Sequence, residues 1–250
     1  MQSLLLVEIR VRRTVIVWSL LAVSGMTAAA QGTSPRTIYR ASWADVAAVS
    51  ATGVVALLPG VLGLPKGPPS CAPCDPSGIP GIDRWVVGRN SAFDRNGSTV
   101  LLLGVGGVAT YWSAHDQSSA EARGNLAVLA NAISWTSAST QWLKVLVRRK
   151  RPVLYTSGAV AAATAADNQR SFPSGHTSVA FAIATSYLVL ADREHLPHRT
   201  RNAMLLYGGA TGVGVLRMTA GSHFTTDVLA GAALGAGIGW LVATVHPRVP

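Results

Sequence analysis

Residues 171–191 read SFPSGHTSVAFAIATSYLVLA, in which a short polar segment runs directly into an apolar one. The apolar run from Val179 to Ala191 predicts a helix, and Pro-Ser-Gly-His predicts the loop that enters it. Ser174 is expected to cap this helix. Gly175 lets the backbone approach a ligand closely, and the free N–H groups of a first helical turn favour an anion. The stretch therefore predicts an anion pocket, with His176 placed to protonate a leaving alkoxide.

A second fragment, K-x6-R-P, runs from Lys144 to Pro152. Pro152 disfavours α conformation for Arg151, so we expect the guanidinium to turn toward the pocket. A guanidinium matches phosphate oxygens with paired hydrogen bonds, whereas Lys144 acts as a point charge. Alone, the five cations between Lys144 and Arg151 would indicate a solvated or positive-inside cluster.

A third fragment, R-x5-H-x3-D, runs from Arg217 to Asp227. His223 and Asp227 are four residues apart, so we expect them to share one helix face. Asp227 would then accept the Nδ1 proton of His223 and leave Nε2 free to attack phosphorus. Arg217 would bind the equatorial oxygens. Together the three fragments predict a phosphate-handling site with three cations, two imidazoles and one carboxylate.

On these motifs the chain, over roughly residues 98–245, resembles the type 2 phosphatidic acid phosphatase superfamily, which also contains vanadium haloperoxidases and bacterial nonspecific acid phosphatases. The resemblance implies that His223 is the nucleophile, Asp227 its partner and His176 the general acid. The phosphate ligands that it implies are Lys144, Arg151, Ser174, Gly175 and Arg217. No metal and no cofactor are expected. One departure is Leu216, where the family usually has serine, and it affects only a peripheral hydrogen bond.

The composition points to a membrane. The chain has 250 residues, is 49% hydrophobic and only 13% charged, and its mean hydropathy is +0.32. Such a chain is too apolar for an ordinary soluble domain. Apolar stretches, most of them near the length of a bilayer span, cover residues 43–64, 98–115, 125–147, 177–191, 203–220 and 228–245. We therefore expect an all-α, membrane-embedded helical bundle with four or five spans, of the kind found in the superfamily.

The N-terminus has the pattern of a secretory signal. Arginines precede an apolar run from Val15 to Val23, and three alanines before Gln31 offer a cleavage site. Residues 1–30 are expected to be a signal peptide or an uncleaved anchor, 31–97 an N-terminal region, and 98–250 the catalytic bundle.

Region 31–97 holds an apolar stretch and then a polar loop with the only two cysteines, Cys71 and Cys74. A C-x-x-C pair can be a redox pair, half a zinc site or a local disulfide. No further ligands with zinc spacing and no thioredoxin-like pattern lie nearby, so we favour a disulfide in an extracytoplasmic loop.

The basic loop 192–202 is expected in the cytoplasm by the positive-inside rule. The three fragments then meet on the outer face of a bacterial inner membrane, provided that 43–64, interrupted by Pro59 and Gly60, does not fully cross. The predicted reaction is metal-independent hydrolysis of a lipid phosphate monoester or diphosphate. A haloperoxidase, or a membrane protein that binds lipid phosphate without turnover, is the alternative. Nucleic-acid binding is disfavoured despite the net charge of +10, because the cations cluster at membrane boundaries and in the pocket.

Overall fold

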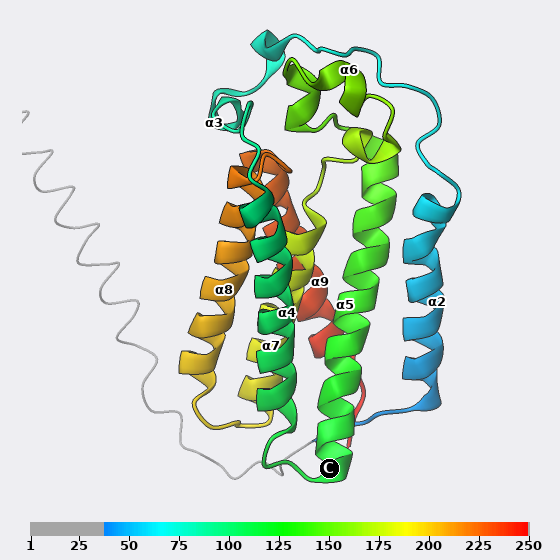
Figure 1. Cartoon of the computed structure of the whole chain (residues 1–250). Helices are drawn as coiled ribbons and strands as arrows, with labels where there is room; N and C mark the ends of the chain where they lie inside the picture. Colours follow the sequence, from blue (N-terminus) through cyan, green and yellow to red (C-terminus); the bar gives the residue numbers. More distant parts are fainter. Residues whose placement is uncertain (1–37, 250) are drawn as a thin grey trace, which may run out of the picture. The chain divides into compact units, whose positions relative to one another are not determined.

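The computed structural model describes residues 38–249, so the predicted signal peptide or anchor, 1–30, lies outside the described residues. The described chain is mostly helical, as predicted. An all-α assignment misses only one antiparallel pair, in which β1 (Ile38–Tyr39) lies beside β2 (Arg248–Val249). The long helices within this range are α2 (Trp43–Val61), α4 (Ala92–Ala114), α5 (Ser119–Val147), α7 (Gly175–Arg193), α8 (Arg199–Thr219) and α9 (Thr225–Val245) (Figure 1).

Side-chain caps fix where α4 and α5 begin. The hydroxyl of Ser91 accepts the backbone N–H of Asp94 at 3.1 Å, so α4 starts before the apolar stretch expected from residue 98. A capping box starts α5, because Ser118 accepts the Glu121 N–H at 3.3 Å while the Glu121 carboxylate accepts the Ser118 N–H at 2.9 Å.

Helix α2 is continuous, contrary to the expected interruption at Pro59 and Gly60. Proline removes the hydrogen bond to the carbonyl four residues earlier, which here belongs to Val55. The indole N–H of Trp142 on α5 donates to that carbonyl at 3.0 Å. Because the carbonyl is satisfied from outside the helix, α2 tolerates Pro59 and reaches Val61.

Helix α7 is at the centre of the bundle and contacts α4, α5, α8 and α9. Its contact with α9 is at backbone distance: a Cβ added to Gly235 would lie 1.9 Å from the carbonyl oxygen of Ser178. Glycine at this position is therefore required for the two helices to pack. The largest core cluster surrounds Tyr187 and Leu190 of α7 and includes Leu206 of α8.

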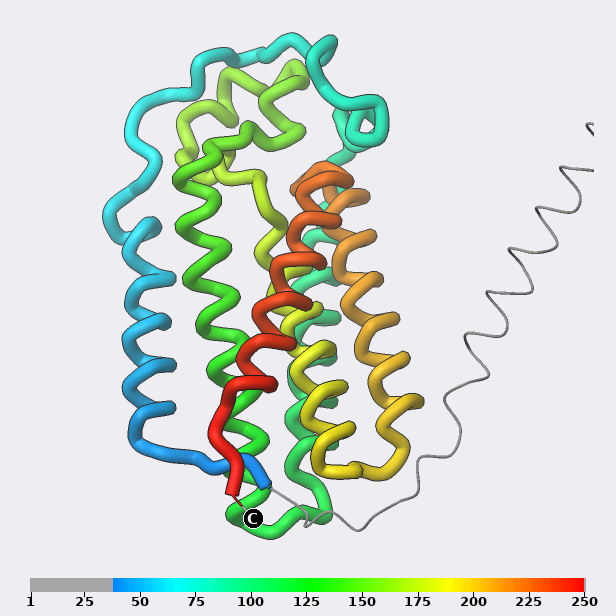
Figure 2. Tube along the Cα trace, turned by 180° about the vertical axis from the view of Figure 1, so that it is seen from behind, coloured from blue at the N-terminus to red at the C-terminus, as the bar shows by residue number. Residues whose placement is uncertain are grey.

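One end of the bundle gathers the start of α4, α7 and α9 with the end of α2, α5 and α8 (Figures 1 and 2). Two connections cover this end, residues 62–91 with η1 (Pro76–Gly78) and α3 (Gly81–Arg84), and residues 148–174 with η2 (Pro152–Tyr155), α6 (Ala159–Ala162) and η3 (Ala166–Gln169). The short α7–α8 connection lies at the opposite end.

Two helices of the described chain, α2 and α9, are long and apolar enough to cross a bilayer by length and composition alone. Helix α2 packs along α5 at the edge of the bundle (Figure 2). It leaves large apolar side chains uncovered, with Trp43 86%, Leu57 67% and Val61 80% exposed.

Candidate active site

A cavity of about 530 Å³ lies at the loop-covered end of the bundle. Its walls come from α4, α5, α7 and α8, the 148–174 connection and the α8–α9 turn. Six residues that the sequence singles out line it: Lys144, Arg151, Gly175, His176, Arg217 and His223. Fragments far apart in the sequence therefore meet around one space. Ser174 and Asp227 do not line it and lie behind it, where the Ser174 N–H donates to the Asp227 backbone carbonyl at 3.0 Å.

Two of the cations are almost completely buried. Lys144 in the last turn of α5 and Arg217 in the last turn of α8 are each 6% exposed. A Cβ added to Gly175 would lie 3.6 Å from Lys144 Nζ, so the amine faces the start of α7. Arg217 Nη1 donates to the hydroxyl of Ser98 at 3.4 Å. Within residues 38–249 neither side chain forms an ion pair with a carboxylate.

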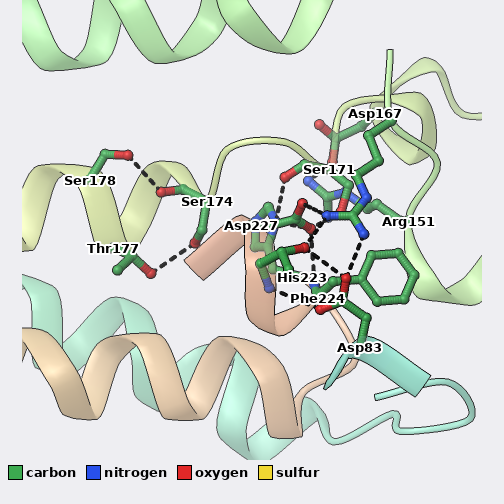
Figure 3. Close-up of polar contacts among 12 residues, drawn as sticks. Asp83, Arg151, Asp167, Ser171, Ser174, Thr177, Ser178, His223, Phe224 and Asp227 are labelled. Atoms are coloured by element: carbon green, nitrogen blue, oxygen red, sulfur yellow. Dashed lines mark hydrogen bonds and ion pairs between the residues drawn. The ribbon is translucent and has the colours of Figure 1, made fainter. Parts of the chain in front are cut away.

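Arg151 is in extended conformation before Pro152, as expected. Its Nη2 forms an ion pair with Asp167 Oδ2 at 2.7 Å (Figure 3). Burial lowers the pKa of the Arg151 guanidinium; the charge of Asp167 opposes this, and Arg170 adds to it. The cavity therefore contains one carboxylate, Asp167, beside an excess of positive charge.

The N-terminus of α7 borders the cavity through Gly175 and His176. Ser174 is the cap residue, as predicted, but its hydroxyl bonds the hydroxyl of Thr177 at 2.9 Å instead of a backbone N–H. The first-turn N–H groups therefore have no side-chain cap, which suits an anion. His176 Nε2 lies 3.1 Å from the hydroxyl of Thr99 on α4.

The arrangement of His223 and Asp227 corrects the sequence prediction. His223 lies in the turn before α9, which begins at Thr225, so the two residues do not share a helix face. Its Nδ1 is 2.7 Å from the backbone carbonyl of Ser171 and 3.7 Å from Asp227 Oδ2. Asp227 instead accepts the hydroxyl of Ser171 at 2.6 Å and the backbone N–H of Phe224 at 2.9 Å (Figure 3). Ser171 therefore contacts both residues, its backbone carbonyl the imidazole and its hydroxyl the carboxylate.

The environment of His223 keeps the ring neutral. Burial lowers the pKa of His223 to about 3, and the nearby Asp227 carboxylate opposes part of the shift. A neutral ring whose Nδ1–H donates to the Ser171 carbonyl carries its lone pair on Nε2. Because His223 lines the cavity, its neutral imidazole can act there as a base or as a nucleophile.

Arg149 was not distinguished by the sequence from the other cations around it, and the structure shows that it is not a solvated charge. Its Nη1 pairs with Asp227 Oδ1 at 2.6 Å and its Nη2 with Asp83 Oδ2 at 2.7 Å. Asp83 is completely buried and also accepts the N–H of Thr226 at 2.9 Å and its hydroxyl at 2.7 Å. Asp83, from the 62–91 connection, is therefore linked through Arg149 to Asp227.

The 62–91 connection is joined to the 148–174 connection near the two cysteines. Cys71 and Cys74 form a disulfide, and the Cys74 N–H donates to the Leu154 carbonyl at 2.8 Å. Leu154 and Ala159 pack against this pair. Among residues 38–249, no group of three or more His, Cys, Asp or Glu side chains is arranged to hold a metal ion.

The cavity presents fixed cations, uncapped backbone N–H groups and a neutral imidazole to one space, which is the donor set that a tetrahedral oxyanion requires. No curated protein and no solved structure matches the chain. The sequence pattern of the PAP2 superfamily, which is largely made up of phosphatases, matches residues 125–250, half of the chain. The matched part includes every predicted site residue except the cysteines. The chain therefore belongs to the PAP2 superfamily, and this membership indicates phosphatase-type activity.

Proposed function

We propose that the protein is a membrane phosphatase that hydrolyses a lipid phosphate monoester or diphosphate without a metal ion, through a phosphohistidine on His223. The observation that carries the proposal is the convergence of Lys144, Arg151, Arg217, His176 and His223 on one cavity. Three cations and a helix N-terminus stabilise the negative charge of a phosphoryl group during its transfer.

In the first step, Nε2 of His223 attacks phosphorus, the P–O bond to the leaving group breaks, and His176 gives its proton to the leaving oxygen. In the second step, His176 takes a proton from water, whose oxygen attacks the phosphohistidine and releases phosphate. Burial of the ring and the three cations both disfavour a positive charge on His176. A bound phosphate dianion offsets them, so the substrate itself favours the protonated imidazole that the first step uses.

The surface of the bundle supports a lipid substrate. Besides α2, the helices α4, α8 and α9 leave large apolar side chains uncovered, among them Leu103 at 69%, Met204 at 69% and Leu229 at 57% exposed. An isolated exposed leucine needs no explanation, but apolar surface on four long helices fits a bilayer. An active site at one end of these helices would then lie at the level of the lipid headgroups.

If the α7–α8 connection lies in the cytoplasm and all the long helices cross the membrane, the site lies on the outer face. The same topology places Trp43, the first residue of α2, at the cytoplasmic end. A cleaved signal peptide would instead deliver residue 31 to the outside, so this topology requires that the chain directly before Trp43 lies in the cytoplasm. Reporter fusions before Trp43 and after Val61 distinguish this topology from one in which α2 does not cross. Only a crossing α2 puts the two reporters on opposite sides of the membrane.

The test is phosphate release by detergent-purified protein from a panel of lipid phosphates, in the presence of EDTA. We expect His223→Gln to lower kcat at least about a thousandfold, because the nucleophile is lost. The control is His115→Gln, since the His115 side chain is 48% exposed and lies at the opposite end of the bundle, after α4. Turnover by His223→Gln within tenfold of wild type, or release that requires a divalent ion, would overturn the proposal.

A further inference from the structure

A second cavity, of about 600 Å³, borders the phosphate pocket. Arg95 and Arg151 line both cavities. The second one extends from these two side chains between the 88–90 turn, the 156–158 turn and the 220–222 turn. Ser222, one of its lining residues, directly precedes His223. The two spaces therefore meet beside the nucleophile.

The second cavity is basic. Its lining contains three arginines, Arg89, Arg95 and Arg151, and no Asp or Glu. Within residues 38–249, neither Arg89 nor Arg95 forms an ion pair. Asn90 holds Arg95 through its side-chain carbonyl, which accepts Nη2 at 2.8 Å, and this neutral contact leaves the positive charge uncompensated. Asp167, the carboxylate of the phosphate pocket, does not line this cavity.

The walls of the second cavity are held in place by backbone packing. Gly221 has φ +65°, and a Cβ added to it would lie 1.8 Å from the carbonyl oxygen of Arg89. Only glycine permits this approach. The turn that carries His223 is thus packed on the turn that carries Arg89, so the distance between the two sites is fixed by the fold.

We propose that this second cavity is an anion subsite for a second phosphate group of the same substrate molecule. The inference rests on the proposed function for the first pocket and names the substrate class. A guanidinium has five N–H donors in a rigid fork, so Arg151 can serve both spaces and bind neighbouring phosphates at once. The shared chemistry fits a lipid diphosphate, or a phosphate monoester joined through a short polyol to a phosphodiester.

Binding of two small probes tests the subsite without turnover. Methylenediphosphonate carries two linked anionic groups and methylphosphonate carries one. By calorimetry, the wild-type protein is expected to bind the diphosphonate about tenfold more tightly. Arg89→Gln is expected to reduce that preference about fivefold, since an exposed guanidinium contributes less than a buried one. Arg123→Gln is the control, because Arg123 is an exposed residue of α5 at the other end of the bundle. Equal affinity of the wild type for both probes, or the same preference in Arg89→Gln, would overturn the subsite.

Turnover of three lipids with the same tail identifies the source of the second phosphate. One is a monophosphate, one a diphosphate, and one a phosphate monoester linked through glycerol to a phosphodiester. For each of the two lipids with a second phosphate, kcat/KM is divided by that for the monophosphate. In Arg89→Gln this ratio is expected to fall about fivefold for the lipid whose second phosphate occupies the second cavity. If no lipid is hydrolysed but the diphosphonate preference holds, the proposed function fails and the subsite stands. If all three are hydrolysed alike by both proteins, the subsite fails and the proposed function stands.

Discussion

Replacement of Arg149 by methionine tests the connection between the 62–91 loop and the start of α9. The guanidinium pairs at 2.7 Å with Asp83 and at 2.6 Å with Asp227, and both carboxylates are completely buried. Arg149→Met leaves these two negative charges without a cation. Removal of one partner from a buried pair costs about 3–5 kcal/mol. The Arg149 side chain is 22% exposed, so water screens part of this, and we expect a loss of about 3 kcal/mol.

The assay is thermal unfolding in detergent, where a loss of about 3 kcal/mol corresponds to a Tm roughly 6–12 °C lower. Lys150→Met is the matched control, because it removes a neighbouring charge that forms no ion pair within the described residues. A double-mutant cycle combines Arg149→Met with Asp83→Asn. The loss of unfolding free energy in the double variant should be at least about 1 kcal/mol smaller than the sum of the losses in the two single variants. Strict additivity, or an Arg149→Met protein as stable as Lys150→Met, would refute the linked network.

Two further predictions concern the imidazole and the helix packing. Burial lowers the pKa of His223 to about 3. The contribution of the neutral imidazole to the free energy of unfolding is therefore complete above about pH 6.5 and is lost as the pH falls toward 3. The free energy of unfolding of the wild type should therefore decrease as the pH falls below about 6.5. Its slope should be steeper than that of His223→Gln by up to about 1.4 kcal/mol per pH unit. Parallel plots of unfolding free energy against pH for the two proteins would contradict this. Gly235→Ala should cost about 2–4 kcal/mol, because its Cβ would lie 1.9 Å from the Ser178 carbonyl oxygen. Gly237→Ala, where nothing lies within 4 Å, should not destabilise, and equal Tm values for the two would contradict the close packing.

The sequence predicted the apolar part of each long helix and six of the residues that line the cavity, although Ser174 and Asp227 lie outside its lining. Apolar stretches became the long helices because their length and periodicity do not depend on distant contacts. Each of the three fragments carries residues whose local geometry is set nearby, such as Arg151 before Pro152 or Gly175 at a helix start. Their meeting at one cavity followed from topology, since the end of α5, the start of α7 and the end of α8 lie at the same end of the bundle.

The second layer around the site could not be predicted, because its residues depend on tertiary contacts. Arg149 lies in a run of cations in which only burial against Asp83 and Asp227 distinguishes it. Asp83 lies 66 residues from Arg149 and 143 residues from Thr226, and it belongs to no motif. The position of His223 had a readable signal: Asp227 lies three residues after Phe224, a spacing that lets a carboxylate accept the cap N–H and begin a helix at Thr225.

The most direct test of the central claim is to trap the phosphorylated enzyme. Wild-type protein is mixed with a lipid phosphate, quenched in base to preserve the acid-labile phosphohistidine, digested and analysed by mass spectrometry. Our account predicts phosphate on the peptide that contains His223, carried by that imidazole, and none on it in His223→Gln. Turnover by the wild type with phosphate on His176, or with no phosphorylated histidine during the steady state, would contradict it.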